Sequence, residues 1–222
     1  MLPVLLQSLI LAASGLLSVG SITLMILLLI SDRGWRNGLG YALGYTSAYT
    51  VIGTGAVLLG YRASGGGPAK PSLVFPMVMT ALGALLLWLA IRNWRKPPSN
   101  DNKPPRFFAI VDTITPPKAF GFGALVTVIN FKNLALYLSA ISVVVLSDLP
   151  LPQKLTIAAL VALVFCLSVI IPVLVYLSAP RRAAETLGAF KTLLERHSRP
   201  IGIWLPLIFG TILFAKGLSE IL

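Results

Sequence analysis

The sequence predicts an all-α polytopic membrane protein in which six transmembrane helices form two inverted three-helix repeats. Hydrophobic residues make up 56% of its 222 residues and charged residues only 11%, and the mean hydropathy is +0.87. A soluble domain of this length is far more polar. Because no connection could hold a soluble domain, residues 1–222 are expected to form one integral membrane domain. Six apolar segments reach the roughly 20 residues that a bilayer core requires, namely 4–30, 38–60, 72–91, 119–146, 154–178 and 201–219.

Positive charge is distributed unevenly between alternate connections, which predicts the orientation. The positive-inside rule places the more basic connections in the cytoplasm and both termini outside a bacterial cytoplasmic membrane. The net charge of +11 then follows from topology and contact with anionic membrane lipids, and nucleic acid is not expected as a partner. The first, third and fifth connections carry Arg33, Arg36, Arg92, Arg95, Lys96, Lys103, Arg106, Lys118, Arg181, Arg182, Lys191, Arg196 and Arg199, against Arg62, Lys70, Lys154 and Lys216 on the other side.

The first segment is interrupted near its middle by small and polar residues. Ser14, Ser18 and Ser21 lie there with Gly15 and Gly20. These residues weaken a helix and bring hydroxyl groups to mid-depth in the bilayer. We therefore expect a helix interruption at which Ser18 and Ser21 can bind a substrate.

The second segment carries small residues at helical spacing. Gly40 and Gly44 form a GxxxG pattern, and Gly53 and Gly55 follow. A face of small residues suits close packing against another helix, within the bundle or in a second subunit. We expect it to pack within the bundle.

The third connection is polar and rich in proline from 95 to 105, which predicts a mobile cytoplasmic loop. Asp112 follows it, shortly before Pro116 and Pro117 start the fourth helix. Asp112 is a candidate coupling or gate residue near a cytoplasmic mouth. Capping a turn, or pairing with a nearby Arg or Lys, is the more common role of such a residue.

Three polar residues interrupt the fourth segment, and one of them is charged. If residues 119–146 form one helix, Lys132 lies near the bilayer centre, with Asn130 and Asn133 on either side. A central lysine costs about 2.5–3.5 kcal/mol on insertion scales, so such residues usually face a cavity, a partner or a substrate. The amide groups cannot be satisfied by hydrocarbon. Asn130, Lys132 and Asn133 are therefore candidate substrate-binding residues.

The fifth segment contains Pro172, which predicts a kink and a candidate gate, although kinks are common in membrane helices. Residues 181–197 then show apolar residues at helical spacing with charged residues on the other faces. This pattern predicts an amphipathic helix on the cytoplasmic leaflet.

The two interruptions fall in the first helix of each three-helix half, about 1–94 and 118–222, on either side of a cytoplasmic loop of about 95–117. Both interrupted segments end in a Ser-Asp pair, Ser31-Asp32 and Ser147-Asp148. Because three helices per half is odd, the second copy must be inverted, and such repeats with broken helices indicate a transporter site at the midplane. Ser18 and Lys132 should then approach each other. The alternative is that Gly and Ser only permit close helix packing.

Several classes of function lack the residues they need. The single cysteine, Cys166, lies in an apolar segment and is expected to be a small buried residue, and the single histidine, His197, has no partner ligand nearby in sequence. We expect no metal site, no cofactor, no catalytic residues and no enzymatic activity, because no nucleophile-base pair or nucleotide-binding loop is visible. The energy source, the substrate's identity and the oligomeric state stay open.

The fourth helix carries a family resemblance. Thr115-Pro116-Pro117-Lys118-Ala119-Phe120-Gly121, followed by Asn130-Phe131-Lys132-Asn133, resembles the NPKN-type helix of the LysE-like exporter superfamily, and its Gap/Sap branch of glycolipid- and sulfolipid-addressing proteins in particular. Leu17-Ser18-Val19-Gly20 is similar to the family's first helix. Val19 and Phe131 stand where the family usually has proline. The resemblance implies export or surface delivery of a cell-envelope glycolipid, glycopeptidolipid or sulfolipid.

Three hypotheses remain. A lipid exporter would use Lys132 and the asparagines for a polar or anionic headgroup. A small-solute exporter of the amino-acid type would need a counter-charge, and no acidic residue lies in the middle of any span. A non-transporting scaffold for an export complex would need no midplane lysine. The candidate partners are membrane lipids, the envelope glycolipid, a second copy in a homodimer and an envelope-lipid export machinery.

Overall fold

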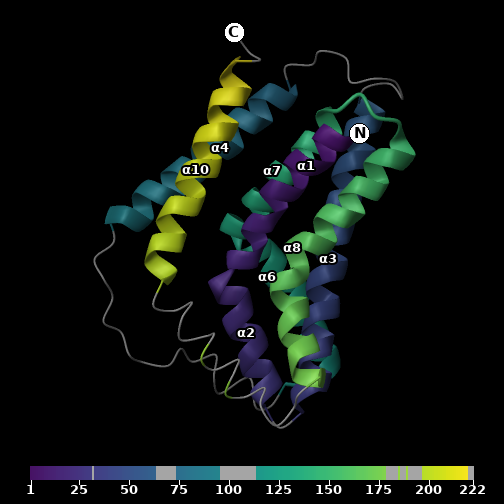
Figure 1. The fold of residues 1–222 in the computed structure, drawn as a ribbon, viewed down its shortest axis with the longest axis vertical. Helices are drawn as coiled ribbons and strands as arrows, with labels where there is room; N and C mark the ends of the chain where they lie inside the picture. Colours follow the sequence, from purple (N-terminus) through teal and green to yellow (C-terminus); the bar gives the residue numbers. More distant parts are fainter. Residues whose placement is uncertain are drawn as a thin grey trace.

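The computed structural model describes residues 1–31, 33–63, 74–95, 114–178 and 197–219, together with positions 185 and 189. Within these residues the chain forms eight α-helices and one short 3-10 helix, with no strand, so the all-α prediction is confirmed there (Figure 1). The elements are α1 (Leu2–Ala12), η1 (Ala13–Leu17), α2 (Val19–Ile30), α3 (Gly34–Ala63), α4 (Val74–Arg95), α6 (Pro116–Ile129), α7 (Phe131–Leu146), α8 (Leu151–Ser178) and α10 (Ser198–Ser219).

Long apolar helices mark the chain as a membrane protein. Two helices, α3 and α8, are each long and apolar enough to cross a membrane. Two bent pairs, α1–η1 with α2 and α6 with α7, raise the number of candidate spans to four if each pair is one span. That α4 and α10 also cross, which the six-span prediction requires, stays a prediction.

The helices form a bundle in which α3 and α8 pack together, with α6 against α3 and the first helix against both α7 and α8. α4 and α10 pack extensively on each other and both contact α7. The start of α1 and the end of α10 lie at the same end of the molecule (Figure 1). The number of crossings and the orientation in the membrane stay predictions.

Both predicted helix interruptions are present. The chain bends by 55° between η1 and α2, at Ser18, and by 76° between α6 and α7, at Asn130. The two break residues have nearly the same backbone conformation, with φ −78° and ψ 78° at Ser18 and φ −81° and ψ 72° at Asn130. Such values are close to those of an inverse γ-turn, which reverses direction locally without a glycine. Polar residues thus suffice to break both helices here.

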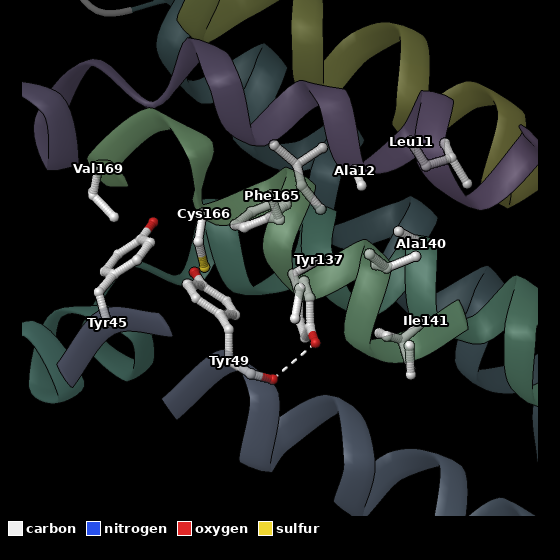
Figure 2. Packing of buried hydrophobic residues seen from close by; sticks show 14 of the residues in the cluster. Leu11, Ala12, Tyr45, Tyr49, Tyr137, Ala140, Ile141, Phe165, Cys166 and Val169 are labelled. Atoms are coloured by element: carbon white, nitrogen blue, oxygen red, sulfur yellow. Dashed lines mark hydrogen bonds between the residues drawn. The ribbon is translucent and has the colours of Figure 1, made fainter. Parts of the chain in front are cut away.

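The core is built around a row of aromatic side chains. Tyr41, Tyr45 and Tyr49 of α3 lie one above another at a spacing of four residues and are fully buried. The Tyr49 ring centroid lies 4.7 Å from that of Tyr137 on α7 and 4.9 Å from that of Phe165 on α8. The Tyr137 hydroxyl also donates to the Tyr49 carbonyl at 2.8 Å (Figure 2). These contacts join α3, α7 and α8 into one unit.

Glycine allows α3 and α6 to pack with their backbones in contact. A Cβ atom at Gly44 would clash with the carbonyl oxygen of Phe120, and one at Gly123 would clash with that of Tyr41. The expectation that the small-residue face of 38–60 packs within the bundle is therefore confirmed.

Some of the other predicted features lie within the described residues and some do not. Asp112, residues 96–105 of the predicted loop and the amphipathic helix of 181–197 lie outside the described residues, apart from the separate positions 185, 189 and 197. Arg95, which was predicted to begin the loop, is instead the last residue of α4. Pro172 lies buried inside α8. Cys166 is buried, as expected.

Lys154, which the sequence analysis counted among the cations of the connections, is nearly fully buried, with 2% of its side chain exposed. Its ammonium donates to the carbonyl of Val145, in the last turn of α7, at 2.8 Å. A cation at a helix C-terminus interacts favourably with the helix dipole.

We expect Lys154→Met to lower the free energy of unfolding by about 1–3 kcal/mol, because a charge-assisted hydrogen bond is lost and the Val145 carbonyl is left unpaired. Denaturant titration of the purified protein in detergent measures this change. An unchanged unfolding midpoint would show that water replaces the ammonium at no cost.

Candidate functional site

Four buried polar side chains meet where the two helix breaks approach each other. We call Ser18, Ser21, Tyr45 and Asn133 the central polar cluster; all four are buried. Ser18 and Ser21 stand at the start of α2, Asn133 in the first turn of α7 and Tyr45 in the middle of α3. The breaks bring these residues together because each turns the first residues of a new helix toward α3.

A continuous hydrogen-bond network connects the central polar cluster. The Asn133 amide donates to the Ser18 hydroxyl and, at 3.4 Å, to the Tyr45 hydroxyl. Ser18 donates to Ser21 at 3.0 Å, and Ser21 donates to Tyr45 at 3.2 Å. Within the central polar cluster, Asn133 is therefore the residue that connects the second half of the chain to the first.

Asn130 supports the cluster from the break itself. Its side-chain oxygen accepts from the backbone N–H of Asn133 at 3.3 Å, which is the usual role of an N-cap asparagine. Its own carbonyl accepts from the Leu134 N–H at 3.0 Å. Asn130 thus positions Asn133 and does not itself join the network between the halves.

Lys132 lies beside the cluster, and its side chain is half-buried. It forms no hydrogen bond or ion pair with any residue that the structure describes. Ser18 bonds to Asn133, the residue that follows Lys132 in the chain. The predicted approach of Ser18 to Lys132 itself stays a prediction. A lysine in the first turn of α7 opposes the helix dipole, so its charge adds to the positive potential of that helix end.

Apolar side chains beside the breaks point away from the bundle. Ile129 and Phe131, on either side of Asn130, are 62% and 66% exposed, and Leu17, next to Ser18, is also exposed. Exposed apolar side chains therefore stand close in sequence to residues of the buried central polar cluster, at both helix breaks. A molecule with a polar head and an apolar tail could meet both environments here.

Some hydroxyl groups near the cluster have unused hydrogen-bonding capacity. The hydroxyls of Tyr41 and Tyr49, one helical turn on either side of Tyr45, and that of Ser14 are buried with no hydrogen-bond partner among the described residues. Buried groups of this kind usually bond to water or to a ligand.

Of the five residues that the sequence predicts to bind substrate, Ser18, Ser21 and Asn133 lie in the central polar cluster, Asn130 caps α7 and Lys132 lies beside the cluster. The sequence analysis did not include the tyrosines among them. The available signal was the spacing of three tyrosines at four-residue intervals in an apolar helix, which places their hydroxyls on one face. No group of three or more His, Cys, Asp or Glu residues that could hold a metal ion occurs in the described part of the chain.

The fold and the site together define a helical membrane protein with a polar site at two helix breaks. A family model described as Sap, sulfolipid-1-addressing protein, matches residues 9–219, and the chain belongs to this family. No curated protein and no solved structure matches the chain. The family's description indicates a role in the delivery or export of lipid.

Proposed function

We propose that this protein is an exporter that translocates or delivers a cell-envelope glycolipid, of the glycopeptidolipid or sulfolipid type, across the cytoplasmic membrane. The observation that carries the proposal is the half-buried Lys132 at a helix break, which has no hydrogen-bond or ion-pair partner among the described residues. It stands in the chain between Asn133 of the central polar cluster and the exposed Phe131. The sulfolipid-addressing family supports a lipid as the substrate. Assignment to the LysE-like exporter superfamily is part of the proposal.

In this proposal the headgroup and the acyl chains of the lipid occupy different environments. Lys132 and the positive end of α7 attract an anionic or strongly polar headgroup. Ser18 and Asn133 exchange the hydrogen bond between them for bonds to that headgroup. The acyl chains stay in the bilayer beside Ile129 and Phe131, whose exposed side chains offer no barrier to lateral entry.

We also propose that the two halves are inverted repeats, each contributing one broken helix. Matching local geometry supports this. Besides the similar break residues, Ser31 and Ser147 end α2 and α7 with extended backbones, and each hydroxyl donates to the carbonyl three residues earlier at 2.7 Å. Alternating access would follow if the halves move against each other around the breaks.

A substrate carrying an ammonium group has less support. Asp148 and Glu185 are the acidic residues in the described part of the chain, and both are exposed. Neither belongs to the central polar cluster, so the cluster offers no counter-charge for an amino-acid-type solute.

Lys132→Met tests the proposed function. The change keeps the apolar stem and removes a half-buried charge, so the protein should be at least as abundant in the membrane, while lipid delivery should fall at least about tenfold if one charged contact of roughly 1.5–3 kcal/mol is lost. Surface lipid and membrane abundance are measured together in cells that depend on this protein for delivery.

Asn130→Leu should act in the same direction but less strongly, because it removes only a helix cap.

Lys118→Met is the matched control, since Lys118 is an exposed lysine at the start of α6. Lys118→Met should change neither the delivery of lipid to the surface nor the abundance of the protein in the membrane. Full lipid delivery by Lys132→Met would end the proposal that this ammonium binds the substrate. Loss of folded Lys132→Met protein would instead indicate that the lysine pairs with another group of the protein.

A further inference from the structure

Three tryptophans and two arginines lie at the same level, at one end of the α4–α10 pair, and take no part in the central polar cluster. We call this group the Trp–Arg cluster. It consists of residues from the last two turns of α4 and one residue of the second turn of α10, namely Trp88, Arg92, Trp94, Arg95 and Trp204.

The packing of α4 on α10 places these residues at the same level. Gly83 lies against the backbone of Phe214, and Gly210 lies against the backbone of Leu87, so the two helices run antiparallel. From Gly210, about two more turns toward the start of α10 lead to Trp204, which therefore lies at the level of the last turns of α4.

The side chains of the Trp–Arg cluster are unusually exposed for their size. Trp88, Trp94 and Trp204 are 54%, 62% and 57% exposed. The Arg92 guanidinium lies 5.3 Å from the centroid of the Trp88 ring, within the range of a cation–π contact. Neither Arg92 nor Arg95 forms an ion pair with any residue that the structure describes.

The chemistry of these groups matches a phospholipid headgroup. Indole rings prefer the boundary between hydrocarbon and headgroups, and a guanidinium can bind a phosphate through two parallel hydrogen bonds. Arginines in the last turn of a helix also offset the helix dipole. The helix dipole does not explain why the indoles are exposed. It also does not explain a second arginine–tryptophan pair, Arg36 over Trp35, because this pair stands at the start of α3, where a positive charge opposes the dipole.

We propose that the Trp–Arg cluster binds the headgroups of anionic phospholipids and so anchors the α4–α10 pair in an anionic leaflet. This site is separate from the proposed export site. It does not depend on the identity of the delivered lipid, because its ligand is a structural lipid of the bilayer.

The test uses the tryptophans as reporters. The full chain carrying Trp35→Phe, in which the three remaining indoles all belong to the cluster, is reconstituted in phosphatidylcholine bilayers. Brominated phosphatidylglycerol and brominated phosphatidylcholine are compared as quenchers at equal mole fractions. Each arginine near an anionic headgroup should strengthen binding of that lipid about fivefold, so two arginines should make phosphatidylglycerol associate about 25-fold more strongly than phosphatidylcholine at low salt. This preference should be smaller at high salt, because salt screens the charges.

Arg92→Gln and Arg95→Gln should each lower this ratio about fivefold, and together they should bring it close to one. Replacement of both by lysine should retain most of the preference, which shows that the fold is intact. Arg62→Gln, an exposed arginine in the last turn of α3, should leave the ratio unchanged. Equal quenching by the two lipids in the parent, no effect of the double glutamine variant, or an equal effect of Arg62→Gln would each overturn the proposal.

Discussion

Asn133→Leu should lower both the stability of the protein and its delivery of lipid. The leucine cannot donate to Ser18 and Tyr45, which are buried and bonded to Asn133 across the two halves of the chain. A buried polar group that loses its partner costs about 1–3 kcal/mol, so the expected loss in free energy of unfolding is about 2–4 kcal/mol. Unfolding titrations in detergent and lipid delivery in cells measure the two effects.

Ser139→Ala is the matched control for Asn133→Leu. Ser139 is also buried in α7, but its hydroxyl donates to the Ala135 carbonyl of the same helix. Its loss should cost less than about 1 kcal/mol and leave delivery intact. Asn133→Asp keeps the shape of the side chain but removes both N–H donors, and it should resemble Asn133→Leu. Normal stability of both Asn133 variants would show that the network does not hold the halves together.

The sequence was sufficient to locate the helix breaks. Ser18 and Asn130 stand in apolar segments among residues that weaken a helix, and hydrocarbon offers no partner for their polar groups. The chain must therefore bring those groups against protein, and it does so at both positions with nearly the same φ and ψ. This prediction depended on local composition alone, which is why it could be made.

The arrangement of side chains around the breaks could not be predicted in the same way. Lys132 attracted attention because a central charge is costly, yet its neighbour Asn133 makes the contacts with Ser18 and Tyr45. Which of two consecutive residues turns inward depends on the 76° bend, and the sequence does not encode that angle locally. Similarly, Tyr49 contacts Tyr137 through the packing of distant helices.

The close approach of α3 and α6 is a second feature whose sequence signal was visible but incomplete. The GxxxG pattern predicted a close contact on α3, without its partner helix. Gly44 lies against the carbonyl oxygen of Phe120, whereas Gly55 on the same helix has open space where a Cβ would be. Alanine variants of the two glycines can therefore distinguish the effect of close helix packing, at Gly44, from the intrinsic cost of glycine in a helix, at Gly55.

Gly44→Ala should destabilise the protein, while Gly55→Ala should not. Alanine in place of a helical glycine gains up to about 1 kcal/mol in helix propensity, and Gly55→Ala should show this gain. At Gly44 the added methyl group would overlap the Phe120 carbonyl, so α3 and α6 must separate at a cost typically of about 1–3 kcal/mol. Thermal unfolding of both variants in one detergent should therefore place Gly44→Ala below the parent and Gly55→Ala at or above it. Equal stabilities would mean that α6 shifts freely on α3, and the shared backbone contact would then not position the break at Asn130.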